Sequence, residues 1–306
     1  MKKTFIPQEF KDKYSKIMGQ EAQEFFKYCQ TKQPKSLWIN SLKINPNELY
    51  KTLSEKGWKL KELFHQNAFE ITNVQKPGSS QEFQEGLFNL QEKASMLPAL
   101  ALNPKEKEKA LDAAAAPGNK TLQLACLMNN KGQIIALDKN KQRMKSLLFN
   151  IKKFGIKNTK TITKDLLLTT KKDVFDKVLL DAPCSSEGLV RKDFKALKNW
   201  SQKLVLAKSK LQKKMIIRAF DLLKRNGILV YSTCSLSPEE NEEVIDYLLK
   251  KRKCEIKPTK FKGIKTRKGL QEYENKKYSE EVTLCSKLYP QDNDTQAFFI
   301  AKIRKT

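Results

Sequence analysis

Short apolar runs alternate with amphipathic segments along most of this chain, and the alternation predicts its fold. The strand candidates are residues 109–115, 132–138, 159–163, 175–181 and 228–232, and segments with helical spacing lie between them at 121–128, 141–154 and 204–223. Strands and helices that alternate in this way build a parallel sheet covered by helices on both faces. We therefore predict an α/β domain, with residues 296–303 as its closing strand.

The residues before this domain follow other patterns. Residues 8–30 place aromatic and aliphatic side chains at helical spacing, which predicts one or two amphipathic helices that pack on the rest of the protein. A β-α-β pattern follows, with a strand at 36–44, a helix that starts at Asn45-Pro46 and ends near Gly57, and one or two strands over 58–71. A turn at 76–80 and a helix from residue 87 to about 103 lead into the alternating region.

These patterns predict three parts. They are an N-terminal helical segment at 1–35, a small α+β module at 36–80 and an α/β domain at 81–306. Within the last part, a further helix starts at Pro238, and the acidic residues of its first turn suit the positive end of a helix dipole. The Lys-rich segment 257–277 is either a solvated insertion or a contact for a polyanion.

Composition narrows the functional class. Lys and Arg number 60 against 34 acidic residues, a formal net charge of +26. Such self-repulsion is typical of a protein that binds a polyanion, and a Lys-rich proteome is the alternative explanation. No apolar block is long enough to span a membrane, and the basic N-terminus lacks the apolar core of a secretory signal.

The cysteine and histidine content predicts a cytoplasmic protein without a metal site. Six cysteines without close pairing argue against a disulfide framework and favour a reducing compartment. His65 is the only histidine, and no Cys-x-x-Cys pair exists, so neither histidine catalysis nor a zinc site is expected.

Carboxylates follow the first three strands of the alternating region. Asp112, Asp138 and Asp165 end or follow strands whose carboxyl ends share one edge of the sheet. Small residues at 113–118, including Pro117 and Gly118, allow a ligand to approach the backbone at a helix N-terminus. Together these features predict a nucleoside cofactor across that edge, with Asp138 at the ribose and Asp165 at the adenine amine. The alternative is that each Asp caps a helix and the small residues serve packing.

Two thiols leave neighbouring predicted strands at the same edge. Cys184 follows the strand 175–181, Cys234 follows the strand 228–232, and each precedes a serine. We predict that both face one substrate, whereas Cys29, Cys126, Cys254 and Cys285 are inert core residues. Two thiols, an Asp and a nucleoside cofactor suit the methylation of carbon 5 of cytosine. A thiolate that adds to carbon 6 makes carbon 5 nucleophilic, and a base must then remove the carbon 5 proton.

Three motifs carry a family resemblance. Asp-Ala-Pro-Cys-Ser at 181–185, Ser-Thr-Cys-Ser at 232–235 and Pro-Glu-Glu-Asn-Glu at 238–242 together resemble the Nop/Sun family of RNA cytosine-5 methyltransferases. The likeness continues through 86–92, 114–120 and 298–301 and covers roughly residues 36–303. It implies an S-adenosylmethionine-dependent enzyme with a Rossmann-like methyltransferase sheet behind a small N-terminal α+β RNA-binding module.

The resemblance also implies roles for single residues. Cys234 would be the nucleophile, and Cys184 would assist proton removal and product release. Asp181 would hold the ring nitrogen and amine of the cytosine, with Lys120 near the cofactor or the base. The implied cofactor contacts are Ala114, Ala115, Ala116, Pro117, Gly118, Asn119, Lys120, Asp138, Arg143, Asp165 and Asp181. Ala114 and Asn119 stand where the family usually has Cys and Gly, and neither side chain is needed for the chemistry.

The predicted function is therefore transfer of a methyl group from S-adenosylmethionine to carbon 5 of cytosine in RNA, with tRNA as the substrate and a monomeric enzyme. The alternatives are the same chemistry on rRNA and a catalytically silent, basic RNA-binding protein. A DNA cytosine methyltransferase is disfavoured. Such enzymes use the Pro-Cys cysteine as nucleophile, usually before Glu-Asn-Val, whereas here Ser185-Ser186 follows and a second Thr-Cys exists.

Overall fold

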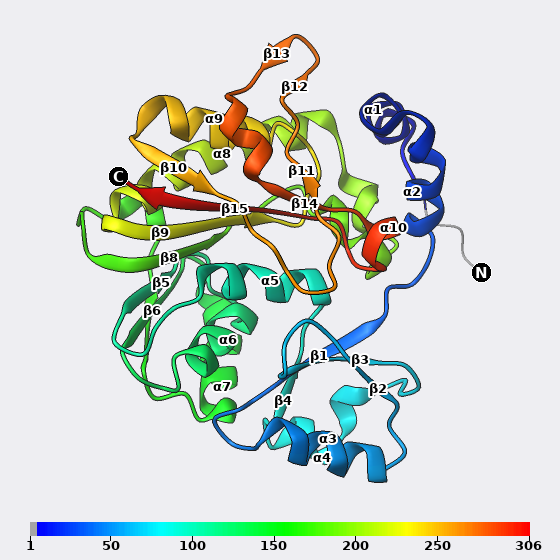
Figure 1. Cartoon of the computed structure of the whole chain (residues 1–306), viewed down its shortest axis with the longest axis vertical. Helices are drawn as coiled ribbons and strands as arrows, with labels where there is room; N and C mark the ends of the chain where they lie inside the picture. Colours follow the sequence, from blue (N-terminus) through cyan, green and yellow to red (C-terminus); the bar gives the residue numbers. More distant parts are fainter. Residues whose placement is uncertain (1–4) are drawn as a thin grey trace.

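The computed structural model describes residues 5–306 and contains a small and a large sheet (Figure 1). Residues 1–4, which begin the predicted N-terminal segment, lie outside the described residues. The small sheet lies at the bottom of Figure 1, beneath the large sheet and its helices. Within residues 5–306, no helix is both long and apolar enough to cross a membrane.

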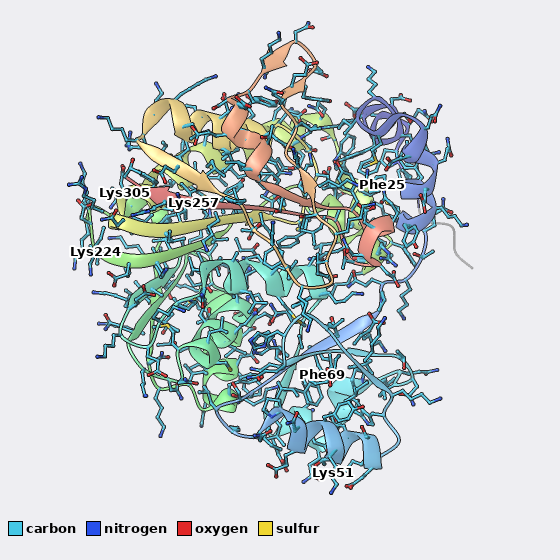
Figure 2. All side chains as sticks on the ribbon, viewed as in Figure 1. Phe25, Lys51, Phe69, Lys224, Lys257 and Lys305 are labelled. Carbon is cyan, nitrogen blue, oxygen red and sulfur yellow. The ribbon has the colours of Figure 1, made fainter. Side chains whose placement is uncertain are left out.

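The N-terminal segment forms two helices, as its spacing predicted. They are α1 (Gln8–Met18) and α2 (Ala22–Cys29). Their buried aromatic side chains, among them Phe10, Tyr14 and Phe25, pack against Trp200 and Leu236 of the large domain. Figure 2 shows Phe25 on the inner side of α2, which faces that domain. The N-terminal helices are therefore part of the large domain's core and are distant from the small sheet that follows them in the chain (Figure 1).

The small sheet has the strand order β2-β3-β1-β4 and is antiparallel at every pairing. Its strands are β1 (Lys35–Ile39), β2 (Leu60–Glu62), β3 (Ala68–Ile71) and β4 (Phe88–Leu90), and its helices are α3 (Pro46–Glu55) and α4 (Gln81–Gln84). Asn45 caps α3, because its side chain accepts a hydrogen bond from the backbone of Asn47. Figure 2 shows Phe69 of β3 inside this module and Lys51 of α3 on its outer surface.

The end of the small module differs from its sequence pattern. The residues from 87 onward were predicted to be helical, but Phe88–Leu90 form β4 and pair with β1, and the helix α5 (Lys93–Leu102) starts only afterwards. Helical spacing is shared by any short apolar run, so it cannot exclude a strand whose partner lies about fifty residues away. The small sheet thus takes residues up to 90, beyond the predicted boundary at 80.

The large sheet has the order β11-β14-β15-β9-β8-β5-β6-β7. Its parallel strands are β5 (Lys109–Asp112), β6 (Gln133–Asp138), β7 (Thr159–Thr163), β8 (Phe175–Asp181) and β9 (Leu223–Thr233). The helices α5, α6 (Asn119–Leu127) and α7 (Lys141–Phe154) cover one face, and α8 (Gln202–Asp221) and α9 (Glu242–Lys251) cover the other (Figure 1). This is the predicted α/β arrangement.

The sheet is mixed, although the alternating pattern predicted a parallel one. The closing strand β15 (Phe298–Lys305) runs antiparallel to β9. It also pairs with β10 (Cys254–Lys257) and β14 (Ser286–Leu288), and β11 (Arg267–Lys268) extends β14. The Lys-rich segment 257–277 holds β11 and the small hairpin of β12 (Glu272–Tyr273) and β13 (Lys276–Lys277), and α10 (Pro290–Asn293) precedes β15.

The central strands are buried on both faces, because helices cover both sides. Leu179 and Val230 face the core beneath α5 and α6, and Val178, Leu180 and Leu229 face the core beneath α8 and α9. At ~25 cal/mol per Å² of apolar surface removed from water, each fully buried side chain of this kind stabilises the fold by about 2 kcal/mol. Packing on both faces thus holds in place the carboxyl ends of β5 to β9, where the predicted site residues lie.

Candidate active site

The two thiols that leave β8 and β9 meet. The strands are parallel and pair Asp181 with Ser232, so the loops that follow them start side by side. These loops bring the Cys184 and Cys234 sulfurs to 3.1 Å from each other, close enough for an S–H···S hydrogen bond. Residues fifty positions apart in the sequence therefore present one sulfur pair, as the sequence predicted.

Position at a cavity, rather than burial or a raised pKa, distinguishes the pair from the other cysteines. The hydrogen bond with Cys234 and burial raise the pKa of the Cys184 thiol well above its ordinary value. Burial raises the pKa of Cys29 to about 12 and of Cys126 and Cys254 to about 11, which keeps these thiols protonated and unreactive. Of the six cysteines, all within the described residues, Cys184 and Cys234 are the two that line the cavity described next.

A cavity of about 430 Å³ opens at the carboxyl edge of the large sheet. Both sulfurs line it, together with Asp181 at the end of β8. The remaining lining includes these predicted cofactor contacts: Ala114, Ala116, Pro117, Asp138, Arg143 and Asp165. One cavity therefore joins the predicted cofactor site to the predicted reaction site.

The Asp181 carboxylate is held on both of its oxygens. Lys120 Nζ donates to Asp181 Oδ2 at 2.7 Å, and Ser232 Oγ donates to Asp181 Oδ1 at 2.7 Å. The Lys120 ammonium also donates to Ser95 Oγ at 3.0 Å, which fixes its position from the side of α5. The carboxylate remains one-third exposed toward the cavity, so its free lone pairs can accept hydrogen bonds from a substrate.

The lining fits a nucleoside. Asp138 is buried and accepts hydrogen bonds from the backbone of Ala116 at 3.1 Å and of Asn140 at 2.9 Å, while each carboxylate oxygen keeps a lone pair for a ribose hydroxyl. Asp165 accepts from the backbone of Leu167 at 2.9 Å, so it caps a 3-10 helix and lines the cavity at once. Apolar side chains from Leu166, Leu211 and Met215 provide a surface for a base.

The glycine loop before α6 is packed closely against α7. Gly118 has φ of +115°, and a Cβ added there would lie 2.6 Å from Leu147 Cδ1, so only glycine suits this position. The loop lines the cavity with small residues, among them Ala114, Ala116 and Pro117. The carboxylate acceptors, the loop of small residues and the cavity volume thus suit S-adenosylmethionine, which when bound supplies a sulfonium methyl group.

Four predicted cofactor contacts do not line the cavity. Ala115 is buried against α7, Gly118 serves the turn, Asn119 begins α6, and Lys120 binds Asp181. Their side chains support the loop and the carboxylate. The loop reaches the cavity through their neighbours Ala114, Ala116 and Pro117.

Several residues at the site were not assigned a role from the sequence. Ser232 and Ser95 orient the Asp181–Lys120 pair, and Lys208 of α8 lines the cavity. The sequence could have indicated a role for Ser232, because Ser232 ends the predicted strand that follows the strand ending at Asp181. Ser95 and Lys208 had none, because their contacts join segments far apart in sequence.

Solved structures with the same fold define the class of the protein. A methyltransferase homologue from Pyrococcus horikoshii superposes with a TM-score of 0.87 at 35% identity and covers 96% of this chain and 94% of its own. NSun6 from Pyrococcus horikoshii, solved with the S-adenosylmethionine analogue SFG, superposes with a TM-score of 0.85 at 25% identity and covers 98% of each chain. The fold is that of an S-adenosylmethionine-dependent methyltransferase with an N-terminal domain.

Sequence relatives identify the family. The family described as 16S rRNA methyltransferase RsmB/F matches residues 99–304, and the N-terminal domain of 16S rRNA methyltransferase RsmF matches residues 6–93. The tRNA (cytosine(49)-C(5))-methyltransferase of Pyrococcus abyssi is 41% identical over 98% of this chain and 96% of its own length. The chain belongs to the RsmB/F (Nop/Sun) family of RNA cytosine-5 methyltransferases, as its motifs predicted.

Another relative has a longer chain. The ribosomal RNA small subunit methyltransferase F of Vibrio parahaemolyticus is 39% identical over 98% of this chain, which spans 63% of the length of that enzyme. Taken together, the family matches, the sequence relatives and the solved structures confirm the family, the Rossmann-like fold and S-adenosylmethionine as cofactor. The roles of the single residues stay predictions.

Proposed function

We propose that this protein transfers a methyl group from S-adenosylmethionine to carbon 5 of a cytosine in tRNA. One observation carries the proposal: a single cavity holds the Cys184–Cys234 sulfur pair, the Asp181 carboxylate and an acidic nucleoside site. A cytosine that enters this cavity has a nucleophile, a hydrogen-bond acceptor and a methyl donor within one enclosure. Entry requires the base to leave its stack, which costs a few kcal/mol.

Cys234 is the nucleophile in this proposal. The hydrogen bond with Cys234 and burial raise the pKa of Cys184, so Cys184 holds its proton more tightly than a free thiol and can donate its S–H to the attacking Cys234 sulfur, since either sulfur of the pair can be the donor. The Cys234 thiolate adds to carbon 6 of cytosine, and the electron pair of the carbon 5–carbon 6 double bond moves so that carbon 5 becomes nucleophilic. Asp181 holds the cytosine ring nitrogen and amine, with Lys120 and Ser232 fixing the carboxylate.

Cys184 assists the second half of the reaction. After carbon 5 has received the methyl group, its proton must leave. The electron pair of that C–H bond then restores the ring double bond and expels the Cys234 thiolate. The Cys184 sulfur lies 3.1 Å from the sulfur that carries the adduct, a position from which it can take part in proton removal and release.

A basic groove next to the small module supports RNA as the substrate. We define the basic groove by Lys32, Lys35, Lys76, Lys192, Lys195 and Lys198, which line two adjoining cavities of about 390 and 540 Å³. Lys35 and Lys76 belong to the small module, and Lys192 follows the helical turn Glu187–Arg191 that leaves the Cys184 loop. Phe194, whose side chain is 37% exposed, offers a surface for base stacking.

A cluster of lysines is not enough to identify the RNA-binding surface, because lysines also gather far from the cavity. Figure 2 shows Lys224, Lys257 and Lys305 together at the far end of the large sheet, opposite the carboxyl edge that holds the cavity. The six lysines of the basic groove make no ion pair within residues 5–306, whereas Lys224, Lys257 and Lys305 each pair with a carboxylate. Unlike those three lysines, the groove lysines have no carboxylate partner among the described residues, so their charge can meet phosphates.

The match to the Pyrococcus abyssi tRNA enzyme, over nearly the whole length of both chains, supports tRNA as the substrate. Bisulfite sequencing of cellular tRNA and rRNA with and without the gene identifies the modified cytosine. A lost signal in rRNA alone would contradict tRNA as the substrate. We further propose that the enzyme acts as a monomer, which light scattering of the purified protein tests.

The two cysteines provide the test of the chemistry. Cys234→Ala removes the nucleophile, so we expect no methyl transfer and no covalent RNA. Cys184→Ala keeps the nucleophile but impairs release, so we expect a protein–RNA adduct that survives denaturing electrophoresis. Cys254→Ala is the matched control, because Cys254 lies outside the cavity. Identical behaviour of the Cys184 and Cys234 variants would overturn the assigned roles.

A further inference from the structure

Behind the sulfur pair lies a buried network of carboxylates that the proposed chemistry does not use. Glu187 belongs to the loop that follows Cys184, and Glu240 belongs to the loop that follows Cys234. Glu187 is 3% exposed and Glu240 is fully buried. A buried carboxylate costs several kcal/mol unless hydrogen bonds and charges compensate it, so two of them side by side require an explanation.

Each carboxylate reaches across to the other cysteine loop. Glu187 Oε1 accepts hydrogen bonds from the backbone of Leu236 at 2.8 Å and of Ser237 at 2.9 Å, just beyond Cys234. In the opposite direction, Glu240 Oε2 accepts from the backbone of Ser185 at 2.9 Å, the residue after Cys184. The two loops thus exchange carboxylate contacts reciprocally.

A single hydroxyl joins the two carboxylates. Ser235 Oγ lies 2.8 Å from Glu187 Oε1 and 3.1 Å from Glu240 Oε1, and a serine has one O–H proton to donate. Both contacts are satisfied when Ser235 donates to Glu187 and a protonated Glu240 donates to Ser235. Burial and the charge of Glu187 raise the pKa of Glu240 to about 7, which agrees with this arrangement.

The loops also touch through their backbones. The amide of Gly188 donates to the Cys234 carbonyl at 2.8 Å. A Cβ at this position would lie 2.6 Å from that carbonyl oxygen and 2.5 Å from the Ala297 oxygen, so a side chain would force the loops apart. The carboxylates therefore act on loops that are already in direct contact.

The remaining contacts anchor the network to the helices. Trp200 Nε1 donates to Glu187 Oε2 at 2.7 Å, and the Tyr14 hydroxyl of α1 donates to Glu187 Oε1. Gln212 of α8 donates to Glu240 Oε2 at 2.9 Å and to the Pro183 carbonyl at 3.1 Å, next to Cys184. Helices on two sides thus hold the carboxylates in place.

We propose that Glu187 and Glu240 are positioning residues. They hold the Cys184 and Cys234 loops in a fixed relative position and thereby set the distance between the two sulfurs. The proposal rests on the proposed function for its catalytic meaning, but the sulfur separation can be measured without any substrate. Neither carboxylate lines the cavity, so each acts through the cysteines and makes no contact with cofactor or base.

The contacts predict an asymmetry between the two positions. Glu187 receives only donors, so Glu187→Gln would turn an amide N–H toward another N–H or O–H and leave donors unpaired. Glu240→Gln keeps a carbonyl oxygen for Ser185 and Gln212, and its NH₂ group can donate to Ser235 Oγ as the protonated acid does. Glutamine should therefore substitute at 240 and fail at 187.

The experiment measures how fast the two thiols form a disulfide in the free enzyme. Diamide takes two electrons and two protons from the Cys184 and Cys234 thiols and is reduced to the hydrazine, and peptide mass spectrometry quantifies the linked pair. We expect about tenfold slower closure in Glu240→Ala and Glu187→Gln, because each substitution removes buried hydrogen bonds that join the two loops. Glu240→Gln should stay within about twofold of the unmodified sequence.

Glu243→Gln is the matched control, because Glu243 lies on α9 and binds Lys213 and Lys276 away from the cysteine loops. Wild-type disulfide rates in both Glu240→Ala and Glu187→Gln would overturn the proposal. If Glu187→Gln does not fold, the comparison of Glu240→Ala with Glu240→Gln decides, together with Ser235→Ala, which removes the shared hydroxyl.

Methyl-transfer rates are then measured on the same proteins. Parallel losses in disulfide rate and kcat, with an unchanged KM for RNA, support positioning. A change in the disulfide rate without methyl transfer by any protein, including the unmodified one, would refute the proposed function and leave the positioning role standing.

Discussion

The two cysteine loops have a front, which faces the cavity, and a back, which packs against α1 and α8. The two sides differ in burial and in how their polar groups are hydrogen-bonded. The front presents Asp181 and the sulfur pair to a cavity, and Asp181 has lone pairs left without a protein partner. The back is buried, and both oxygens of Glu187 and of Glu240 make hydrogen bonds within the protein. The comparison separates two uses of polar side chains. Side chains with unused hydrogen-bonding groups can bind a substrate, and side chains whose hydrogen bonds are all made within the protein hold the loops in position.

The largest effect is expected at the front. Asp181→Asn should lower the methyl-transfer rate by about 10³, because the charge that holds the cytosine is lost, a typical effect of removing one electrostatic contact in a reaction site. The amide oxygen still accepts from Lys120, so the melting temperature should change little. Radiolabelled methyl transfer and calorimetry measure both. Asp173→Asn, on the surface near Lys305, is the control, and an equal loss there would contradict the assignment.

At the back, the expected effect is on folding. Gly188→Ala should lower the free energy of unfolding by about 2–4 kcal/mol, because its Cβ would overlap the carbonyl oxygens of Cys234 and Ala297. Urea unfolding measures the change. Gly78→Ala is the control, since a Cβ at Gly78 would meet its nearest neighbour at an ordinary 3.6 Å. Equal stability of the two variants would mean that the loops can separate without cost.

The back should also show a pH dependence of stability. The pKa of Glu240 rises from an ordinary 4.5 to about 7 on folding, so the folded protein binds this proton more tightly. This contribution is fully present below about pH 4.5 and is lost as pH rises through about 7, a decrease of about 1–3 kcal/mol.

Glu240→Gln removes that titration. The difference in unfolding free energy between the unmodified protein and this variant, measured in urea from pH 4.5 to 8, should shrink or change sign as pH rises. Asp112, whose pKa burial raises to about 6, titrates in both proteins and cancels in the difference. A difference that does not vary with pH would show that Glu240 keeps the same charge throughout this range.

The smallest effect is expected in the basic groove, beyond the front of the site. Replacing Lys76 and Lys192 with Ala should reduce the slope of log affinity against log salt by about 2 and leave the methyl-transfer rate at saturating RNA unchanged. Filter binding over a salt series measures the slope. Lys224→Ala with Lys257→Ala, at the opposite end of the sheet, is the paired control. An equal loss of slope there would place the RNA elsewhere.

The front could be predicted from the sequence, and the back could not. Cys184, Cys234, Asp138 and Asp165 all follow apolar strands, and parallel strands bring such positions to one edge. The acids after Pro238, in contrast, were interpreted as suiting a helix dipole. Glu240 instead lies in the turn before α9 and binds Ser185, because a contact between two loops leaves no periodic signal.

The same distinction applies to the fold. The strand β7 has the predicted bounds, since its apolar and polar positions are set locally. The strands β4, β10 and β14 were missed, because they are short and their partners are distant in sequence. Local pattern predicts what kind of element forms, and non-local pairing decides which short segments join a sheet.

The strand β15 has a consequence for biosynthesis. It lies between β9 and β14 in the sheet, although it follows both of these strands in the chain. Until it emerges, the edge of β9 next to Cys234 has unpaired backbone groups, which are open to pairing with other chains. The nascent polypeptide therefore passes through a stage at which self-association competes with completion of the catalytic sheet, and slow translation between β9 and β15 should lower the yield of active enzyme.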